Sequence, residues 1–270
     1  MKEFGSDYHY IEPCLSNGKP LLEFLPDSIF FANGRQAIQS LINENKWERI
    51  WLPEYFCYEV VSAIEKTGIK VLFYPDNPLN DDETIVPNIN YKEGDVLFRI
   101  NYFGLREWRT NKGIPVAVIE DHSHDLIGDW ALNSDADWCI ASIRKIIPIP
   151  EGGIIWSPKK HPLPKIASQS DENLILVKNR WKAMILKSDY LKEKISSKTE
   201  FRNLFIETEK QFSTLPISSL TPDCMNYLAH FNIKEWVAKK KHNWKILSGI
   251  KSEKMQVLSS RKTNCHEFSF

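Results

Sequence analysis

Short apolar runs alternate with amphipathic segments through the first 156 residues of the chain. The runs are SIFF, IWLP, KVLFY, DVLFRI, VAVIE, DWCIAS and GGIIW. A short continuous apolar run is typical of a strand that is buried on both faces of a parallel sheet. The order of strand, helix and strand is that of βαβ units. The pattern therefore predicts an α/β fold, with a mostly parallel sheet of about seven strands and helices on both faces.

Helical periodicity marks the segments between and after these strands. NGRQAIQSLI and YEVVSAIEKTG are predicted helices, and Gly68 closes the second. From Asn173 to about Phe212 the pattern predicts helix, and a further helix is expected from about Ile233 to Leu247. The apolar side of the segment after Asn173 is expected to carry Leu174, Val177, Trp181, Ile185 and Leu186. A lysine run at 239–241 is typical of a solvent-exposed helix face.

Candidate chemistry is concentrated in residues 116–156. Asp121 and His124 follow the run VAVIE, while Ser142 and Lys145 follow DWCIAS. In open α/β sheets, ligands bind beyond the carboxyl ends of the strands, so an acid and an amine should meet in one crevice. Pyridoxal phosphate (PLP) needs a lysine amine for its imine and a carboxylate for its ring nitrogen. One acid and one lysine at strand ends are common, so this pair alone does not decide the function.

Two further stretches fit a phosphate-bearing ligand. Gly34 and Arg35 begin a predicted helix, where backbone N–H groups favour an anion and an arginine can add a contact. A plain capped helix with a solvent-facing arginine fits the same residues. Tyr55, Phe56 and Tyr58 lie at a strand-to-helix turn, where a ring could stack on a cofactor or simply pack in the core.

Composition narrows the function classes. Lys+Arg and Asp+Glu balance at 35 each, so no basic surplus favours nucleic acid as a partner. The five cysteines are scattered without a CxxC pair, so neither a metal site nor a disulfide framework is predicted. No apolar stretch reaches membrane-spanning length, and the N-terminus lacks a signal-peptide pattern. The expected location is therefore the cytoplasm, without membrane contact.

The motifs, taken in order, resemble the DegT/StrS family of PLP-dependent sugar aminotransferases, which have the aspartate-aminotransferase-like fold. The matching stretches are NGRQAI, LPEYFCYEVV, INYFG, EDHSH and RKIIPIPEGG. Lys145 precedes Glu151 by six residues, as the family pattern requires. The resemblance covers about residues 28–248, and the order and spacing of the motifs are more specific than any one of them.

The resemblance implies roles for individual residues. Lys145 would form the imine with PLP, and Asp121 would contact the ring nitrogen. The other implied cofactor contacts are His124, Ser142, Gly34, Arg35, Tyr55, Cys57 and Asn101, the last on the substrate side.

Four positions depart from the family pattern. Arg35 stands where a small hydroxyl residue is usual, and Cys57 lies near the place of a stacking aromatic. Ser142 precedes the lysine by three residues rather than five, and His124 replaces a glutamine. The retained Lys145 argues against the dehydratase branch of the family, in which histidine replaces this lysine.

The resemblance also implies a domain organisation and a function. Residues 1–160 would form the PLP-binding large domain of a fold-type I transferase, and residues 161–248 its helical continuation and linker helix. Residues 249–270 would be a remnant of the small C-terminal domain, which is otherwise largely absent. The implied protein is a homodimeric aminotransferase that acts on a nucleotide-linked keto-sugar with a small amino donor, in surface polysaccharide biosynthesis.

Two alternatives stay open at this point. The chain could be a truncated or degenerate homologue without catalysis. It could also be a phosphate- or nucleotide-binding α/β protein that does not use PLP, with NGRQAI as its phosphate site.

Overall fold

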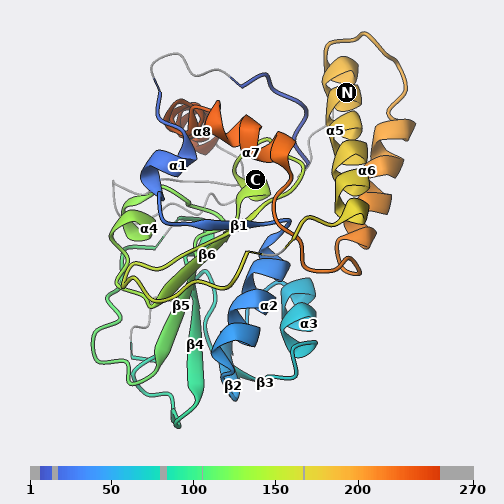
Figure 1. Cartoon of the computed structure of the whole chain (residues 1–270). Helices are drawn as coiled ribbons and strands as arrows, with labels where there is room; N and C mark the ends of the chain where they lie inside the picture. Colours follow the sequence, from blue (N-terminus) through green and yellow to red (C-terminus); the bar gives the residue numbers. More distant parts are fainter. Residues whose placement is uncertain (1–6, 14–17, 80–83, 105, 167, 250–270) are drawn as a thin grey trace.

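A seven-stranded sheet forms the centre of the molecule (Figure 1). The computed structural model describes residues 7–13, 18–79, 84–104, 106–166 and 168–249. The strand order is β1-β7-β6-β5-β4-β2-β3. The strands are β1 (Ile29–Phe31), β2 (Arg49–Pro53), β3 (Lys70–Tyr74), β4 (Asp95–Ile100), β5 (Ala117–Asp121), β6 (Trp138–Ser142) and β7 (Gly153–Trp156).

The predicted α/β class and mostly parallel sheet are confirmed. Strands β2 to β6 pair in parallel, whereas β7 runs antiparallel to both β6 and β1. An apolar run is needed wherever a strand is buried on both faces, whichever way it points, so the sequence pattern predicted β7 without its direction.

Both faces of the sheet are buried, which explains the continuous apolar runs. Val118 packs in one core cluster and its neighbour Ile119 in the other, because successive side chains point to opposite faces. Helices α2 (Gly34–Asn45) and α3 (Tyr58–Glu65) cover the face to which Ile119 belongs. The opposite face is covered by α1 (Leu21–Phe24), α4 (Asp129–Asn133), the start of α5, α7 (Pro222–Ala229) and α8 (Ile233–Ser248).

The segment expected to be helical from Asn173 to about Phe212 is two helices. Helix α5 (Asp171–Leu191) and helix α6 (Thr199–Gln211) pack side by side and project beside the sheet (Figure 1). The chain breaks at Glu193, whose φ of 62° lies in the left-handed region. No glycine or proline marks this break, so the sequence pattern did not predict it.

The expected buried face of α5 is also corrected. Val177 is buried as expected, but Leu174 and Ile185 are exposed, and Leu176 and Met184 are buried in their place. The buried face of α5 differs from the expected one because the helix packs against two cores. One is the sheet-side core near Val177, and the other is a small core shared with α6 near Met184.

Two short 3₁₀ turns and an N-terminal arm complete the described chain. The turns are η1 (Tyr102–Gly104) and η2 (Ile143–Lys145), and they follow β4 and β6 directly. The arm at residues 7–13 lies between α5 and α7, because Tyr10 N–H donates to Met184 O at 2.9 Å and Tyr227 Oη donates to Ile11 O at 2.7 Å.

Candidate active site

The carboxyl ends of β5 and β6 place the predicted acid and amine beside one another. Asp121 ends β5, and Lys145 lies in η2 directly after β6, the neighbouring strand. The charges of both groups act on His124, which follows Asp121 by three residues. The positive charge of Lys145 lowers the pKa of His124, and the negative charge of Asp121 raises it.

Asp121 and Lys145 are both available for a ligand. One oxygen of Asp121 accepts a hydrogen bond from the backbone N–H of Ser123 at 2.8 Å. Among the described residues no basic side chain forms an ion pair with Asp121, and no carboxylate forms one with Lys145. The Lys145 side chain is exposed, while Asp121 is half-buried.

His124 is held as a neutral imidazole. Burial is the largest cause that lowers its pKa to about 4, followed by the charge of Lys145. The Phe103 backbone N–H donates to His124 Nδ1 at 3.3 Å, which leaves Nε2 to carry the proton. The Phe103 ring stacks on the imidazole with centroids 4.9 Å apart.

Phe103 adopts a backbone conformation that is unusual for its type. Its φ is 56°, in the left-handed region that large side chains rarely occupy. The stacking and hydrogen bond to His124 compensate for the strain. Residues in such conformations cluster at ligand-binding sites, which fits the position of η1 at the end of β4.

The N-terminus of α2 lies directly against the end of β6. A Cβ added to Gly34 would be 3.2 Å from Ser142 Cβ, and a Cβ on Gly153 would be 2.3 Å from Asn33 O. Glycine at 153 therefore permits the helix to reach the strand ends. Asn33 caps the helix, because its Oδ1 accepts from Gln36 N–H at 3.0 Å. The backbone N–H of Gln36 is therefore already engaged by the cap, and those of Gly34 and Arg35 remain as the candidates for an anion.

Ser142 is tied to the β5 end as well. Its backbone N–H donates to Ser123 Oγ at 2.8 Å, and Ser123 in turn donates its own N–H to Asp121. The serine and the acid are thus linked through one residue, which the EDHSH motif supplies.

Cys57 and Tyr55 border the same region from the start of α3. The charge of Lys145 acts on the Cys57 thiol, although burial raises the pKa of that thiol more strongly. Cys57 Sγ donates to Glu59 Oε2 at 3.0 Å. Tyr55 is 56% exposed, and its ring meets the Tyr102 ring edge-on at 5.8 Å.

Two predicted contact residues point elsewhere in this structure. Asn101 is 1% exposed, and its Nδ2 lies 3.5 Å from His122 Nδ1, so it does not line an open substrate side. Arg35 lies 3.4 Å from Glu209 Oε1 on α6, a carboxylate that also pairs with Arg144 and Arg180. Any contact of these two with a cofactor stays a prediction.

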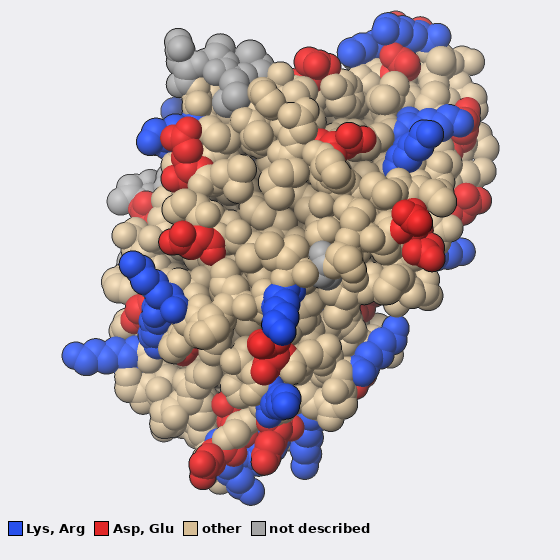
Figure 2. Space-filling model, viewed as in Figure 1, with Lys and Arg blue, Asp and Glu red and all other residues tan. Residues whose placement is uncertain are grey.

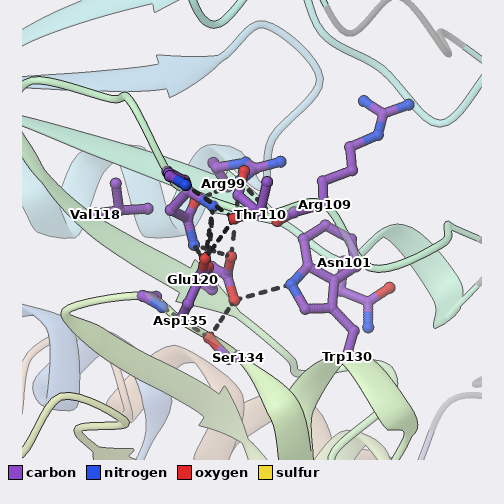
Figure 3. A network of polar contacts seen from close by, with 12 residues as sticks. Arg99, Asn101, Arg109, Thr110, Val118, Glu120, Trp130, Ser134 and Asp135 are labelled. Carbon is purple, nitrogen blue, oxygen red and sulfur yellow. Dashed lines mark hydrogen bonds and ion pairs between the residues drawn. The ribbon is translucent and has the colours of Figure 1, made fainter.

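Behind the site lies a buried polar network that the motif search missed (Figure 3). Glu120 accepts from Ser134 Oγ at 2.7 Å, Asn111 Nδ2 at 2.8 Å and Trp130 Nε1 at 2.9 Å. Arg99 lies 3.8 Å away as its counter-ion and also donates to Asn111. The network joins β4, the loop between β4 and β5, β5 itself, and the α4 region after it, and so fixes the strand end that presents Asp121.

Glu120 also belongs to a group that has the donor types of a metal site. Ligand atoms of Glu120, His122 and Cys139 lie within 4.8 Å of one another, and all three residues are buried. Both oxygens of Glu120 are already engaged by hydrogen bonds, and His122 Nε2 lies 3.2 Å from one of them. These groups satisfy one another, so we interpret the cluster as structural.

The surface carries mixed charge. Lys and Arg are interspersed with Asp and Glu over the face in Figure 2, where no extended basic area appears. Within the described residues, no helix has the length and apolar character needed to span a membrane.

Comparisons with known proteins give the fold. No family model matches the chain, and no curated protein matches it in sequence. A protein assigned as a sugar aminotransferase from Streptococcus pneumoniae, solved in its PLP form, aligns with a TM-score of 0.51 at 12% identity, over 92% of this chain and 67% of that one. The chain has the fold of the PLP-dependent transferases.

Other solved structures match less closely. Serine palmitoyltransferase of Sphingomonas wittichii aligns with a TM-score of 0.48 at 14% identity, over 90% of this chain and 58% of that one. DesI, solved with its TDP-sugar product, aligns with a TM-score of 0.42 at 17% identity, over 53% of this chain and 43% of that one. The chain therefore spans between 43% and 67% of the length of these three.

Proposed function

We propose that this chain binds PLP and is an aminotransferase-like protein related to the DegT/StrS family. The observation that carries the proposal is the grouping of Lys145, His124 and Asp121 at the ends of β5 and β6, with the α2 N-terminus against Ser142. The comparison with a PLP-form structure supports the same cofactor through the fold.

The residues present fit this cofactor. Asp121 is a carboxylate without a basic partner among the described side chains, as a protonated ring nitrogen requires. Lys145 is an exposed amine with no ion-pair partner in the described chain. Gly34 and Ser142 form a close approach of helix and strand at which backbone N–H groups can meet a phosphate.

Each side chain has a defined task in this proposal. PLP, when bound, supplies an electron-withdrawing ring for chemistry at the substrate carbon next to the amine. Lys145 would attach the cofactor through Nζ and, once released, would move a proton at the same atom as base and then acid. Asp121 would stabilise positive charge on the ring nitrogen. His124, neutral at pH 7, would donate from Nε2.

The finer assignments follow from the resemblance and are proposals too. The substrate would be a nucleotide-linked keto-sugar used for surface polysaccharides, the donor a small amino acid, and the location the cytoplasm. Residues 1–160 would form the cofactor domain and 161–248 its helical continuation. The remnant expected at 249–270 lies outside the described residues apart from Gly249.

Association into a homodimer is part of the proposal. Tyr58 is 79% exposed and borders a groove of about 660 Å³ between α2, α3 and residues 212–217. In the family that the chain resembles two subunits complete each active site, so we expect a second copy to contact this exposed ring beside the groove. Sedimentation at micromolar concentration should show a dimer, and a monomer would contradict this part of the proposal.

Titration with PLP tests the central proposal. Wild-type protein should develop a visible absorption band as PLP is added, because attachment to a lysine changes the spectrum of the cofactor. The Lys145→Ala variant should lose the band, while Lys159→Ala, which removes an exposed lysine that pairs with Asp137, should keep it. An unchanged band in Lys145→Ala, or none in folded wild-type protein, would refute the assignment. A band without amine transfer to a keto-sugar nucleotide would identify the non-catalytic homologue.

A further inference from the structure

Helix α8 turns two lysines of its basic run, Lys240 and Lys241, partly toward the protein, and Lys240 is the one that donates to Tyr8. Ile233 is buried, Trp236 and Val237 are partly buried, and the same spacing of three to four residues next reaches Lys240. Lys239 is exposed and pairs with Glu235 at 2.7 Å. The expectation that the whole run faces solvent is therefore wrong for Lys240.

Lys240 lies over the loop that carries Lys145. Its Nζ donates to Tyr8 Oη at 2.8 Å, and Tyr8 Oη donates to the backbone oxygen of Lys145 at 3.1 Å. Trp236, one turn earlier on α8, donates from Nε1 to Ile146 O at 2.7 Å. The N-terminal arm and α8 thus cover the lysine loop together.

The charge of Lys240 has no counter-ion in the described chain. No described carboxylate forms an ion pair with it, and its ammonium donates to the neutral Tyr8 hydroxyl and lies 5.5 Å from the centroid of the Tyr8 ring. Burial lowers the pKa of Lys240 to about 8, so the ammonium form still predominates at pH 7. A half-buried cation without a counter-ion is costly, and an anion would relieve that cost.

Lys240 and Lys145 act on the same imidazole. Both positive charges lower the pKa of His124, which lies at the end of β5. The hydrogen-bonded chain from Lys240 through Tyr8 to the backbone oxygen of Lys145 places the α8 amine beside the loop η2 that carries Lys145. Lys145 is assigned to the cofactor, which leaves Lys240 for another anionic group.

We propose that Lys240, oriented by Tyr8, binds the carboxylate of the amino-acid donor. This proposal rests on the proposed function for the identity of the ligand, and on the Lys240 contacts for its place. A single uncompensated ammonium matches a monoanionic carboxylate. A diphosphate would need more positive charge, yet Lys239 is neutralised by Glu235, and Lys241 acts on the buried Asp125.

Glutarate is a suitable probe because it carries carboxylates but no amine and cannot enter the transfer reaction. Its affinity is measured by calorimetry on the full chain, with and without saturating PLP. Lys240→Met, which keeps length without charge, should weaken glutarate binding about ten-fold or more. Lys239→Met is the matched control and should leave it unchanged. Lys240→Arg should retain most of the affinity, and Tyr8→Phe should lose part of it.

The outcomes separate this proposal from the proposed function. Glutarate binding that is equal in Lys240→Met and wild type, with both folded by circular dichroism, overturns the Lys240 assignment and leaves Lys240 as a support for α8. If Lys240→Met does not fold, a glutarate affinity of Tyr8→Phe equal to that of wild type and of Lys239→Met overturns the assignment instead. Inorganic phosphate that binds through Lys240 while glutarate does not also overturns it. If wild-type protein shows no PLP band but still binds glutarate in a way that depends on Lys240, the result counts against the proposed function and not against the Lys240 assignment.

Discussion

The two carboxylates at the end of β5 lie on opposite sides of the strand, in opposite surroundings. Glu120 is fully buried and accepts hydrogen bonds from Asn111, Trp130 and Ser134 (Figure 3). Asp121 is half-buried and accepts one from the Ser123 backbone. The comparison shows how one strand end can be fixed on one side and left free for a ligand on the other. Glu120, with both oxygens hydrogen-bonded, stabilises the fold, whereas Asp121 keeps an oxygen that can bind a ligand.

Removal of Glu120 should give the largest effect. Glu120→Ala leaves Arg99 without its counter-ion and three donors without an acceptor, so we expect a loss of about 3–5 kcal/mol of unfolding free energy. Urea denaturation followed by circular dichroism measures it. Glu44→Ala, at an exposed position on α2, is the control and should change stability by less than about 0.5 kcal/mol. Equal midpoints for Glu120→Ala and wild type would show that the network does not stabilise the strand end.

Asp121→Asn should have the opposite effect: it should weaken PLP binding but leave the unfolding free energy nearly unchanged. The amide keeps the size of the side chain and its contact with Ser123, so the unfolding free energy of the ligand-free protein should change little. Affinity for PLP should fall roughly 10- to 100-fold, since a hydrogen bond to a charged group contributes about 1.5–3 kcal/mol. Absorbance titration gives the affinity. Wild-type affinity in this variant would contradict the role of Asp121, and a large loss of stability would erase the contrast with Glu120.

A third acid, the buried Asp125, makes the stability of the protein depend on pH. Burial is the main cause that raises its pKa to about 7, against the lowering effects of His122, Lys241 and an Asn101 hydrogen bond, while Asp129 raises it further. Between about pH 4 and pH 7 the unfolded chain releases this proton and the folded chain keeps it, so stability should fall as pH rises through that window. Asp125→Asn cannot ionise and should be more stable than wild type above pH 7, by roughly 1–2 kcal/mol. Melting temperatures of both proteins from about pH 5 to about pH 8 test this, and parallel curves would contradict it.

The sheet and the candidate site were largely predictable because their pattern is local. Strands buried on both faces must be continuously apolar, and polar residues that follow them must lie at the strand ends. That reasoning predicted Asp121 and Lys145 at the ends of neighbouring strands, and in the structure they follow β5 and β6, which pair with each other. The direction of β7 was not predictable, because burial does not depend on direction.

What sequence reasoning missed depends on packing between distant segments. The Glu120 network needs Asn111, Trp130 and Ser134, which no motif connects. Lys240 was assigned to solvent by its charge, although its spacing from Ile233 and Trp236 placed it on the inner face of α8. Its partner Tyr8 lies far away in the sequence. Periodicity was the better guide than charge at this position.

Borohydride reduction of the PLP-treated protein, followed by peptide mapping, tests whether Lys145 is the lysine that attaches PLP. Reduction fixes the cofactor to the lysine that holds it, so the mass of each lysine peptide identifies the attachment site. We expect the label on Lys145, and none on Lys240 or Lys159. Label on another lysine, or none on a folded sample, would contradict it.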